Sequence, residues 1–137
     1  MPGLEEIDIP IGSLIPIQAG IGNTDSLWSL ARADFDAVPA VETVAYPVGS
    51  QLLHLLVHGH HRAYMGFRRG YEAVRGVVAS RDEHLAFLAS TALEGCPTIE
   101  AVHKRYEREW RPYTVGKGIH TVEQLVAEPE IMAATFG

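Results

Sequence analysis

The part of the sequence that decides the fold reads Leu52-Leu53-His54-Leu55-Leu56-Val57-His58-Gly59-His60-His61-Arg62-Ala63-Tyr64. Its first half is an apolar run interrupted by one histidine, which is typical of a strand that is buried on both faces. A helical pattern follows over Arg62–Arg69, and Gly70 is placed to end it. The stretch therefore predicts a buried strand, a glycine turn and a helix in immediate succession.

Further strands are expected on both sides of this stretch. Ile7–Ile11 alternates and contains a proline, which indicates an edge strand, and Leu14–Ile17 is expected as an extended turn after it. Val41–Tyr46 also alternates, and Pro47 is expected to end that strand. Ala73–Ala79 is rich in valine and predicts one more strand after the central helix.

Capping residues mark the expected beginnings of the other helices. The helix after Thr98 has an apolar face at helical spacing, formed by Ile99, Val102, Tyr106 and Trp110. The other helices are expected after Thr24 or Asp25, after the capping box Ser80-Arg81-Asp82-Glu83, and after the capping box Thr121-Val122-Glu123-Gln124.

These elements predict a small α+β protein with a mixed sheet and a helical C-terminal segment. A chain of 137 residues lies in the range of one domain and can bury a substantial core. We expect the sheet-containing domain over residues 1–95 and a helical extension packed on it over residues 96–137.

Composition limits the cellular setting and the class of protein. Cys96 is the only cysteine and cannot form an internal disulfide, so we expect a cytoplasmic protein. No apolar run approaches the ~18 residues that span a bilayer, and the acidic N-terminus lacks the basic start of a signal peptide. We therefore expect no membrane partner.

Charge is distributed unevenly along the chain, although the formal net charge is −6. Residues 1–59 hold one arginine against seven acidic residues, and residues 82–137 hold five basic against nine acidic residues. Residues 60–81 hold five arginines against one glutamate. The positive block begins directly after Gly59, which favours a small anionic ligand there, whereas the net charge disfavours extended nucleic acid.

The turn between the strand and the helix has the chemistry to bind a phosphate. The first N–H groups of a helix have no intrahelical acceptor and lie at the positive end of its dipole. Gly59 allows an oxygen to approach closely, Arg62 offers a planar fork of donors, and His60 and His61 add further donors. A structural glycine turn followed by a solvated basic helix face explains the same residues equally well.

The same residues resemble the ParB/sulfiredoxin superfamily. His58-Gly59-His60-His61-Arg62-Ala63-Tyr64, with Phe67-Arg68-Arg69-Gly70 and the following strand, is similar to the strand–GxxR–helix–glycine–strand pattern of ParB-like domains. The N-terminal Ile7–Pro16 resembles the opening strand of that domain, and Pro39–Val44 resembles the strand before the motif. The resemblance covers roughly residues 7–80.

This resemblance implies a nucleotide pocket whose phosphates lie at the turn Gly59–Arg62. ParB proteins use CTP there, sulfiredoxins use ATP, and related free-serine kinases use ADP or ATP, so the implied cofactor is ATP, ADP or CTP, with or without Mg²⁺. The implied phosphate- or nucleotide-binding residues are Gly59, His60, His61, Arg62 and Arg69. If the chain is an enzyme, His60 and His61 are the candidate catalytic residues.

The sequence departs from the family pattern at the positions that carry catalysis. Sulfiredoxins place a catalytic cysteine directly after the motif glycine, where this chain has His60, and Cys96 is far away. The serine kinases have an acidic residue shortly after their first strand. The matching stretch of this chain has Gln18, and a glutamine cannot act as a general base. His58 replaces the acidic residue that often precedes the glycine. The chain also has no room for the separate helix-turn-helix domain of ParB partition proteins.

Two classes of function follow. The first is a nucleotide-binding, regulatory module without turnover, which the missing catalytic residues favour. The second is a nucleotide-dependent phosphotransferase, or a nuclease or phosphodiesterase, that uses the same turn for phosphate. DNA is a weaker candidate partner because of the net charge, and a homodimer is compatible with the amphipathic C-terminal helices.

A metal site is a lesser alternative. His54, His58, His60 and His61 are closely spaced, but they match no hydrolytic zinc motif. The carboxylate pairs Asp34 with Asp36 and Glu107 with Glu109 are interpreted as solvated faces. The basic residues of the helix after Thr98 are expected to form ion pairs one turn apart, with the aromatic residues facing inward.

Overall fold

A curled five-stranded mixed sheet forms the centre of the computed structural model, which describes residues 3–21 and 29–127. The strand order is β1-β6-β4-β5-β2. The β1–β6 and β4–β5 pairs are antiparallel, and the β4–β6 and β2–β5 pairs are parallel. The strands are β1 (Ile7–Pro10), β2 (Leu14–Pro16), β4 (Val41–Val48), β5 (Gln51–His58) and β6 (Ala73–Ala79). Together with the helices, this sheet confirms the predicted mixed α+β class.

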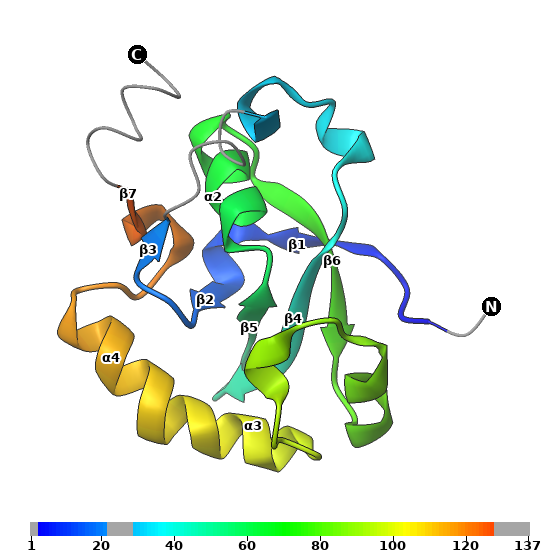
Figure 1. Cartoon of the computed structure of the whole chain (residues 1–137), viewed down its shortest axis with the longest axis vertical. Coiled ribbons are helices and arrows are strands. Elements are labelled where there is room, and N and C mark those ends of the chain that lie inside the picture. The colour runs from blue at the N-terminus through cyan, green and yellow to red at the C-terminus, as the bar shows by residue number, and fades with distance from the viewer. Residues whose placement is uncertain (1–2, 22–28, 128–137) are drawn as a thin grey trace.

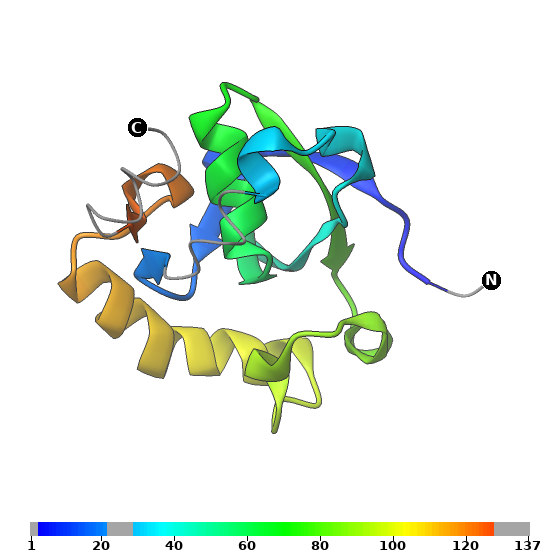
Figure 2. The same cartoon turned by 45° about the horizontal axis from the view of Figure 1, so that its top comes forward.

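The helices are short, and they lie on different sides of the sheet (Figures 1 and 2). The helix α2 follows β5 directly, whereas α3, a π-helical turn and α4 form one continuous rod. A small parallel pair, β3 (Gly20–Ile21) with β7 (Val126–Ala127), lies beside the end of that rod. The helix α2 spans His60–Arg68. The rod consists of α3 (Ile99–Arg105), the π-helical turn (Tyr106–Trp110) and α4 (Arg111–Gly116).

In the described residues, five 3₁₀ helices of one or two turns connect the larger elements. They are η1 (Ile11–Ser13), η2 (Phe35–Ala37), η3 (Asp82–Phe87), η4 (Thr91–Leu93) and η6 (Val122–Gln124). The capping box predicted at Thr121 is confirmed: the Thr121 side chain accepts from the backbone, and Gln124 accepts from the backbone of the cap.

The sheet buries a different cluster on each face. Alternate residues of a strand point to opposite faces, so Val41 and Leu56 pack against α2 with Met65, whereas Val44 and Leu55 pack against the rod. The rod contributes Val102, Tyr106, Ile99 and Trp110 to this second cluster. The predicted apolar face of the helix after Thr98 is therefore confirmed, and the Thr98 hydroxyl caps that helix by accepting from Ala101 N at 3.1 Å.

The strand predictions hold except at two positions. Leu14–Pro16 is not a turn but a strand, β2, that pairs in parallel with β5 at the edge of the sheet. Pro47 does not end β4, which continues to Val48. The ladder of β4 with β6 extends only to Val44, so this part of β4 has β5 as its strand neighbour, and the missing N–H of a proline is tolerated.

The capping box predicted at Ser80 is wrong. The segment forms the 3₁₀ helices η3 and η4 in place of one helix, and the cap residue Arg81 makes no side-chain capping bond. The Asp82 carboxylate instead accepts from Ile99 N at 2.8 Å, at the beginning of α3. The cap predicted at Thr24 or Asp25 lies outside the described residues, although residues 29–32 are helical.

No helix in the described ranges is both long and apolar enough to cross a bilayer.

Candidate functional site

Gly59 makes the sharp turn between β5 and α2. Its φ of 104° and ψ of 29° lie in the left-handed region, which side chains other than glycine rarely adopt. A Cβ on Gly59 would lie 2.8 Å from Cγ1 of Val41 and 3.0 Å from Nη2 of Arg62. The glycine therefore has two functions, because it permits the backbone conformation and leaves room for the neighbouring side chains.

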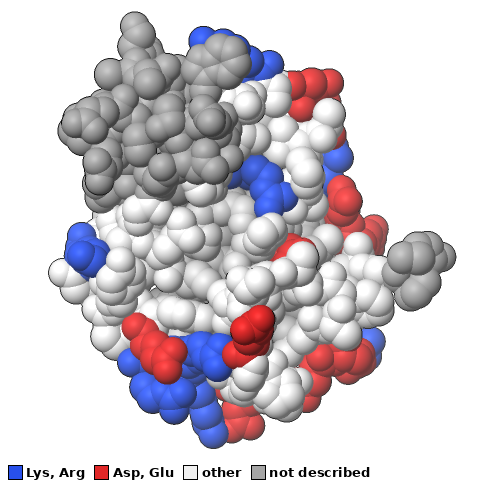
Figure 3. Space-filling model, in the orientation of Figure 1, with Lys and Arg blue, Asp and Glu red and all other residues white. Residues whose placement is uncertain are grey.

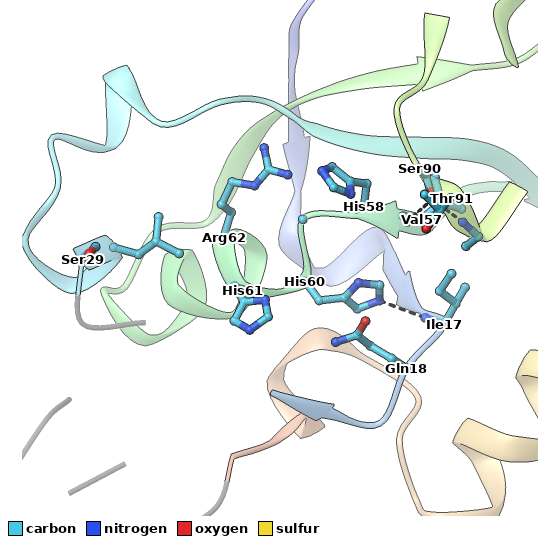
Figure 4. Close-up of a pocket in the computed structure, with 13 residues that line it drawn as sticks. Ile17, Gln18, Ser29, Val57, His58, His60, His61, Arg62, Ser90 and Thr91 are labelled. Carbon is cyan, nitrogen blue, oxygen red and sulfur yellow. Dashed lines mark hydrogen bonds between the residues drawn. The ribbon is translucent and has the colours of Figure 1, made fainter. Parts of the chain in front are cut away.

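A cavity of about 670 Å³ opens at this turn (Figure 4). The end of β5 and the first turn of α2 form one side of it, and the segment after β2 and the turn at Ser90 form the others. The described residues that line it are Ile17, Gln18, Ser29, Leu30, Val57, His58, Gly59, His60, His61, Arg62, Ser90, Thr91 and Ala92. Four of the five predicted phosphate-binding residues are thus brought together in one cavity.

Arg62 is held at the cavity by the loop before β4. Its Nη1 donates to the carbonyl oxygens of Pro39 and Ala40 at 2.8 and 2.7 Å. Among the residues that the structure describes, its Nε and Nη2 have no hydrogen-bond partner. Burial lowers the pKa of Arg62, and the nearby Glu42 carboxylate opposes this shift. An anion at the cavity would supply the acceptor that the remaining donors lack.

His60 is buried and connects α2 to the segment that follows β2 on the other side of the cavity. Its Nε2 accepts from Ile17 N at 3.1 Å, and only 4% of the residue is exposed. Burial, with smaller contributions from His61 and His58, lowers the pKa of His60 to about 3. His60 is therefore neutral at pH 7, and its Nε2 is already used as an acceptor, which makes it poorly suited to proton transfer.

His61 and His58 also face the cavity (Figure 4). His61 lies in the first turn of α2, where its burial and the neighbouring Arg62 lower its pKa. His58 is exposed at the end of β5, opposite Glu42 in the register of the two strands. The lowered pKa keeps His61 neutral at pH 7, so its ring can meet a ligand as a neutral donor or acceptor.

Glu42 fixes the wall of the cavity opposite α2. Its carboxylate accepts from the backbone N–H groups of Ala89, at 2.8 and 3.0 Å, and Ser90, at 3.0 Å. The Ser90 hydroxyl donates to Val57 O at 2.6 Å and accepts from Ala92 N at 3.2 Å. The turn is thereby tied to both β4 and β5, so this wall of the cavity is fixed by the fold.

Arg69, the fifth predicted binding residue, is not brought to the cavity. Its Nη1 donates to Leu30 O at 3.0 Å and to Ala33 O at 2.8 Å. Its guanidinium also lies over the rings of Phe35 and Tyr71, at 5.2 and 5.6 Å from their centres. Arg69 therefore anchors the segment that carries Leu30, and it acts on the cavity only through that segment.

The alternative metal site finds no set of ligands in the described residues. No group of three or more His, Cys, Asp or Glu side chains there comes close enough to hold a metal ion. Asp34 caps η2 by accepting from Asp36 N, and Glu107 accepts from the hydroxyl of Tyr46. These carboxylates have structural partners.

Ser90, which lines the cavity, and Glu42, which holds the turn at Ser90 in place, were not recognised from the sequence. Glu42 looks like an outward-facing residue of an alternating strand, and Ser90 lies in the middle of what was predicted as one helix. Only the register of β4 against β5 brings Glu42 next to His58 and the turn at Ser90. No local pattern could have indicated this.

Comparisons of the chain with protein-family models and with curated proteins give no match. The resemblance to the ParB/sulfiredoxin superfamily therefore stays a prediction. The function has to be argued from the geometry of the cavity.

Proposed function

We propose that the chain is a ParB-like nucleotide-binding protein that places the phosphates of its ligand at the turn Gly59–Arg62 and acts as a binding or regulatory module. The observation that carries this proposal is the cavity of about 670 Å³ that opens at the N-terminus of a nine-residue helix. Its volume lies within the range of small-molecule sites. The helix N-terminus and the neighbouring guanidinium favour a negatively charged group at this end of the cavity.

The hydrogen-bonding pattern of Arg62 supports an anionic ligand. The two carbonyl oxygens that hold Nη1 fix the position of the guanidinium, so little side-chain entropy remains to be lost on binding. Glu42 lies close enough to affect Arg62 electrostatically, but its carboxylate already accepts from two backbone N–H groups of the turn at Ser90. Arg62 therefore keeps donors for a phosphate.

Binding without turnover is the version of this function that the lining favours. No Asp or Glu is among the described residues that line the cavity, so none of them offers a carboxylate as general base or as a direct ligand of Mg²⁺. The pKa of His60 is about 3, which removes one of the two candidate catalytic residues from proton transfer at neutral pH.

The surface charge favours a small ligand over extended nucleic acid. Basic and acidic side chains are interspersed along the lower edge of the face in Figure 3, where α3 lies in Figure 1. In the rod, Glu100 pairs with Lys104 and Arg105 pairs with Glu109. Lys104 and Arg105 thus form the predicted ion pairs one helical turn apart, whereas Arg108 pairs with the adjacent Glu109. Such paired charges cancel much of the positive field that a DNA-binding face requires.

A thermal-shift panel of ATP, ADP, CTP and GTP with Mg²⁺ tests the proposal. A ligand at one hundred times its Kd stabilises the native state by about 2.7 kcal/mol, which raises the Tm of a chain of this length by roughly 8–10 °C. We expect Arg62→Ala to lose most of the ligand-induced shift, measured from its own ligand-free Tm. Arg81→Ala is the matched control, because Arg81 is exposed, forms a surface ion pair with Glu83 and does not belong to the described lining of the cavity.

Each outcome of this panel has a distinct meaning. No shift with any nucleotide, or equal shifts in Arg62→Ala and the wild type, would contradict the proposed site. Steady release of phosphate would replace the binding module by a phosphotransferase or phosphodiesterase. Strong, salt-sensitive binding of DNA would support a partition-protein or nuclease function instead.

A further inference from the structure

A second cavity, of about 440 Å³, lies on the part of the sheet that α2 leaves uncovered. The nine residues of α2 span about 14 Å, whereas the eight-residue strands β4 and β5 span about 26 Å. Val41 and Leu56 belong to the covered half of this face. Ala45 lies two residues after Thr43 in β4, and His54 lies two residues before Leu56 in β5. Both therefore lie on the same face of the sheet as Thr43 and Leu56, and both line the second cavity.

The lining of this cavity is apolar apart from two imidazoles and one hydroxyl. Residues of four adjacent strands line it. Ile7 and Leu52 are its exposed apolar residues, with 43% and 53% of their surface exposed. Ile99 and His103 of α3 complete the wall. None of the described lining residues carries a permanent charge, so a charged ligand would lose hydration without gaining an ion pair.

The hydrogen bonds of His54 fix its tautomer. The Ser13 hydroxyl has one proton, which it donates to Pro10 O at 2.8 Å. The Ser13 oxygen must therefore accept from Nδ1 of His54, 3.0 Å away. Burial lowers the pKa of His54, so the ring is neutral at pH 7 and its Nε2 is an acceptor. His54 is only 7% exposed, and among the described residues its Nε2 has no hydrogen-bond partner.

His103 is fixed in the same manner from the other side of the cavity. Its Nε2 lies 2.7 Å from Ala45 O, and a carbonyl can only accept, so Nε2 carries the proton. The second cavity thus combines an apolar surface with the buried acceptor nitrogen of His54, which has no hydrogen-bond partner among the described residues.

We propose that this second cavity binds a small neutral molecule with an apolar body and a hydroxyl group, a phenol or an alcohol, whose O–H donates to Nε2 of His54. A buried acceptor without a partner is costly, and a ligand hydroxyl removes that cost. The apolar remainder of the molecule would cover Ala45 and contact Leu52 and Ile7 at the mouth. The absence of charge among the described lining residues selects a neutral donor over an ammonium or a carboxylate.

The matched probes p-cresol and p-xylene test this proposal, because they have the same shape and differ in one hydroxyl. Long-range ¹H–¹⁵N spectra of the ¹⁵N-labelled protein report on each imidazole nitrogen. We expect p-cresol to bind with a millimolar Kd and to shift the Nε2 resonance of His54 upfield, as expected for an acceptor that gains a hydrogen bond. Binding of p-xylene should be about ten-fold weaker, because one net hydrogen bond is lost.

A substitution at the mouth of the cavity tests whether p-cresol binds there and not elsewhere on the surface. Leu52→Asp places a charge beside the apolar body of the ligand and should weaken p-cresol binding at least ten-fold. Leu52 is half exposed, so the fold should tolerate the change. Val115→Asp on α4 is the control for an added surface charge, because Val115 is also exposed and does not line this cavity.

Three results would overturn the proposal. The first is an unchanged Nε2 resonance of His54 at millimolar p-cresol. The second is equal affinity for p-cresol and p-xylene, which would show an apolar cavity that makes no use of the histidine. The third is a dimer in sedimentation experiments that Leu52→Asp dissociates, because this face would then be an interface between two copies of the chain.

Discussion

Replacing Gly59 by alanine tests whether the turn at the cavity has the geometry described above. The alanine must adopt a φ of 104°, which costs about 1–2 kcal/mol for a residue with a Cβ. Its Cβ would also lie 2.8 Å from Cγ1 and 3.1 Å from Cβ of Val41, which is 1% exposed and cannot move outward. Forcing an extra carbon into such a site costs about 1–3 kcal/mol more. We therefore expect the free energy of unfolding to fall by about 3 kcal/mol.

Urea unfolding followed by circular dichroism measures this loss, and Gly70→Ala is the matched control. Gly70 also has a positive φ, of 84°, but a Cβ there would meet no atom within 4 Å. Gly70→Ala therefore includes the backbone strain without the collision, and it should lose about 1–2 kcal/mol. Equal losses in the two variants would show that Val41 does not close over Gly59, and the description of the turn would be refuted.

Three further predictions concern the residues around the cavity. Glu42→Ala removes the acceptor of two backbone N–H groups and should lower the free energy of unfolding in urea by about 1–3 kcal/mol. A loss below about 0.5 kcal/mol, on the order of an ordinary surface substitution, would contradict the role of Glu42 in holding the wall. The pKa of His60 is about 3 in the folded chain and 6.5 in the unfolded chain, so between these pH values the unfolded chain binds one more proton at this residue. The free energy of unfolding therefore falls as the pH decreases from 6.5 towards 3, by about 1.4 kcal/mol per pH unit. Urea titrations at pH 7 and pH 5 should show a smaller pH dependence in His60→Gln than in the wild type, and equal pH dependence would mean that His60 is not buried. Arg69→Ala should lower the Tm while leaving the nucleotide-induced shift in place, whereas loss of that shift would assign Arg69 to the ligand.

The strands were predictable because their signals are local. The apolar run before His58 and the valine-rich segment at Ala73–Ala79 each contain enough residues to define a period, and both are strands in the structure. The strand β2 has three residues and takes its conformation from pairing with β5, so its own sequence carries too short a pattern.

The capping prediction at Ser80 failed because tertiary contacts took the side chains that it required. Asp82 caps the beginning of α3, and Glu83 forms a surface ion pair with Arg81. Ser80 N donates to Nδ1 of His84, so the segment closes as a 3₁₀ turn. A capping motif shows which local bonds are available, and the packing of α3 decides which of them form.

The candidate site was predictable as a turn and not as a cavity. Gly59 and Arg62 follow from the strand–glycine–helix pattern, because that pattern places a helix N-terminus beside a basic residue. The wall depends on the pairing register of β4 with β5 and on the position of Ser90. Ser90 is far from both strands in the sequence. The use of Nη1 of Arg62 to hold the loop at Pro39 likewise needs the three-dimensional arrangement.

The backbone amide resonances of residues 60–62 test the central claim most directly. In ¹H–¹⁵N spectra recorded during a titration with ATP and Mg²⁺, and then with CTP and Mg²⁺, we predict that the amides of His60, His61 and Arg62 shift most with at least one of the two nucleotides. Those shifts should be lost in Arg62→Ala and kept in Arg81→Ala. Amides that stay unchanged at millimolar concentrations of both nucleotides, or largest shifts far from the first turn of α2, would contradict a phosphate site at this turn.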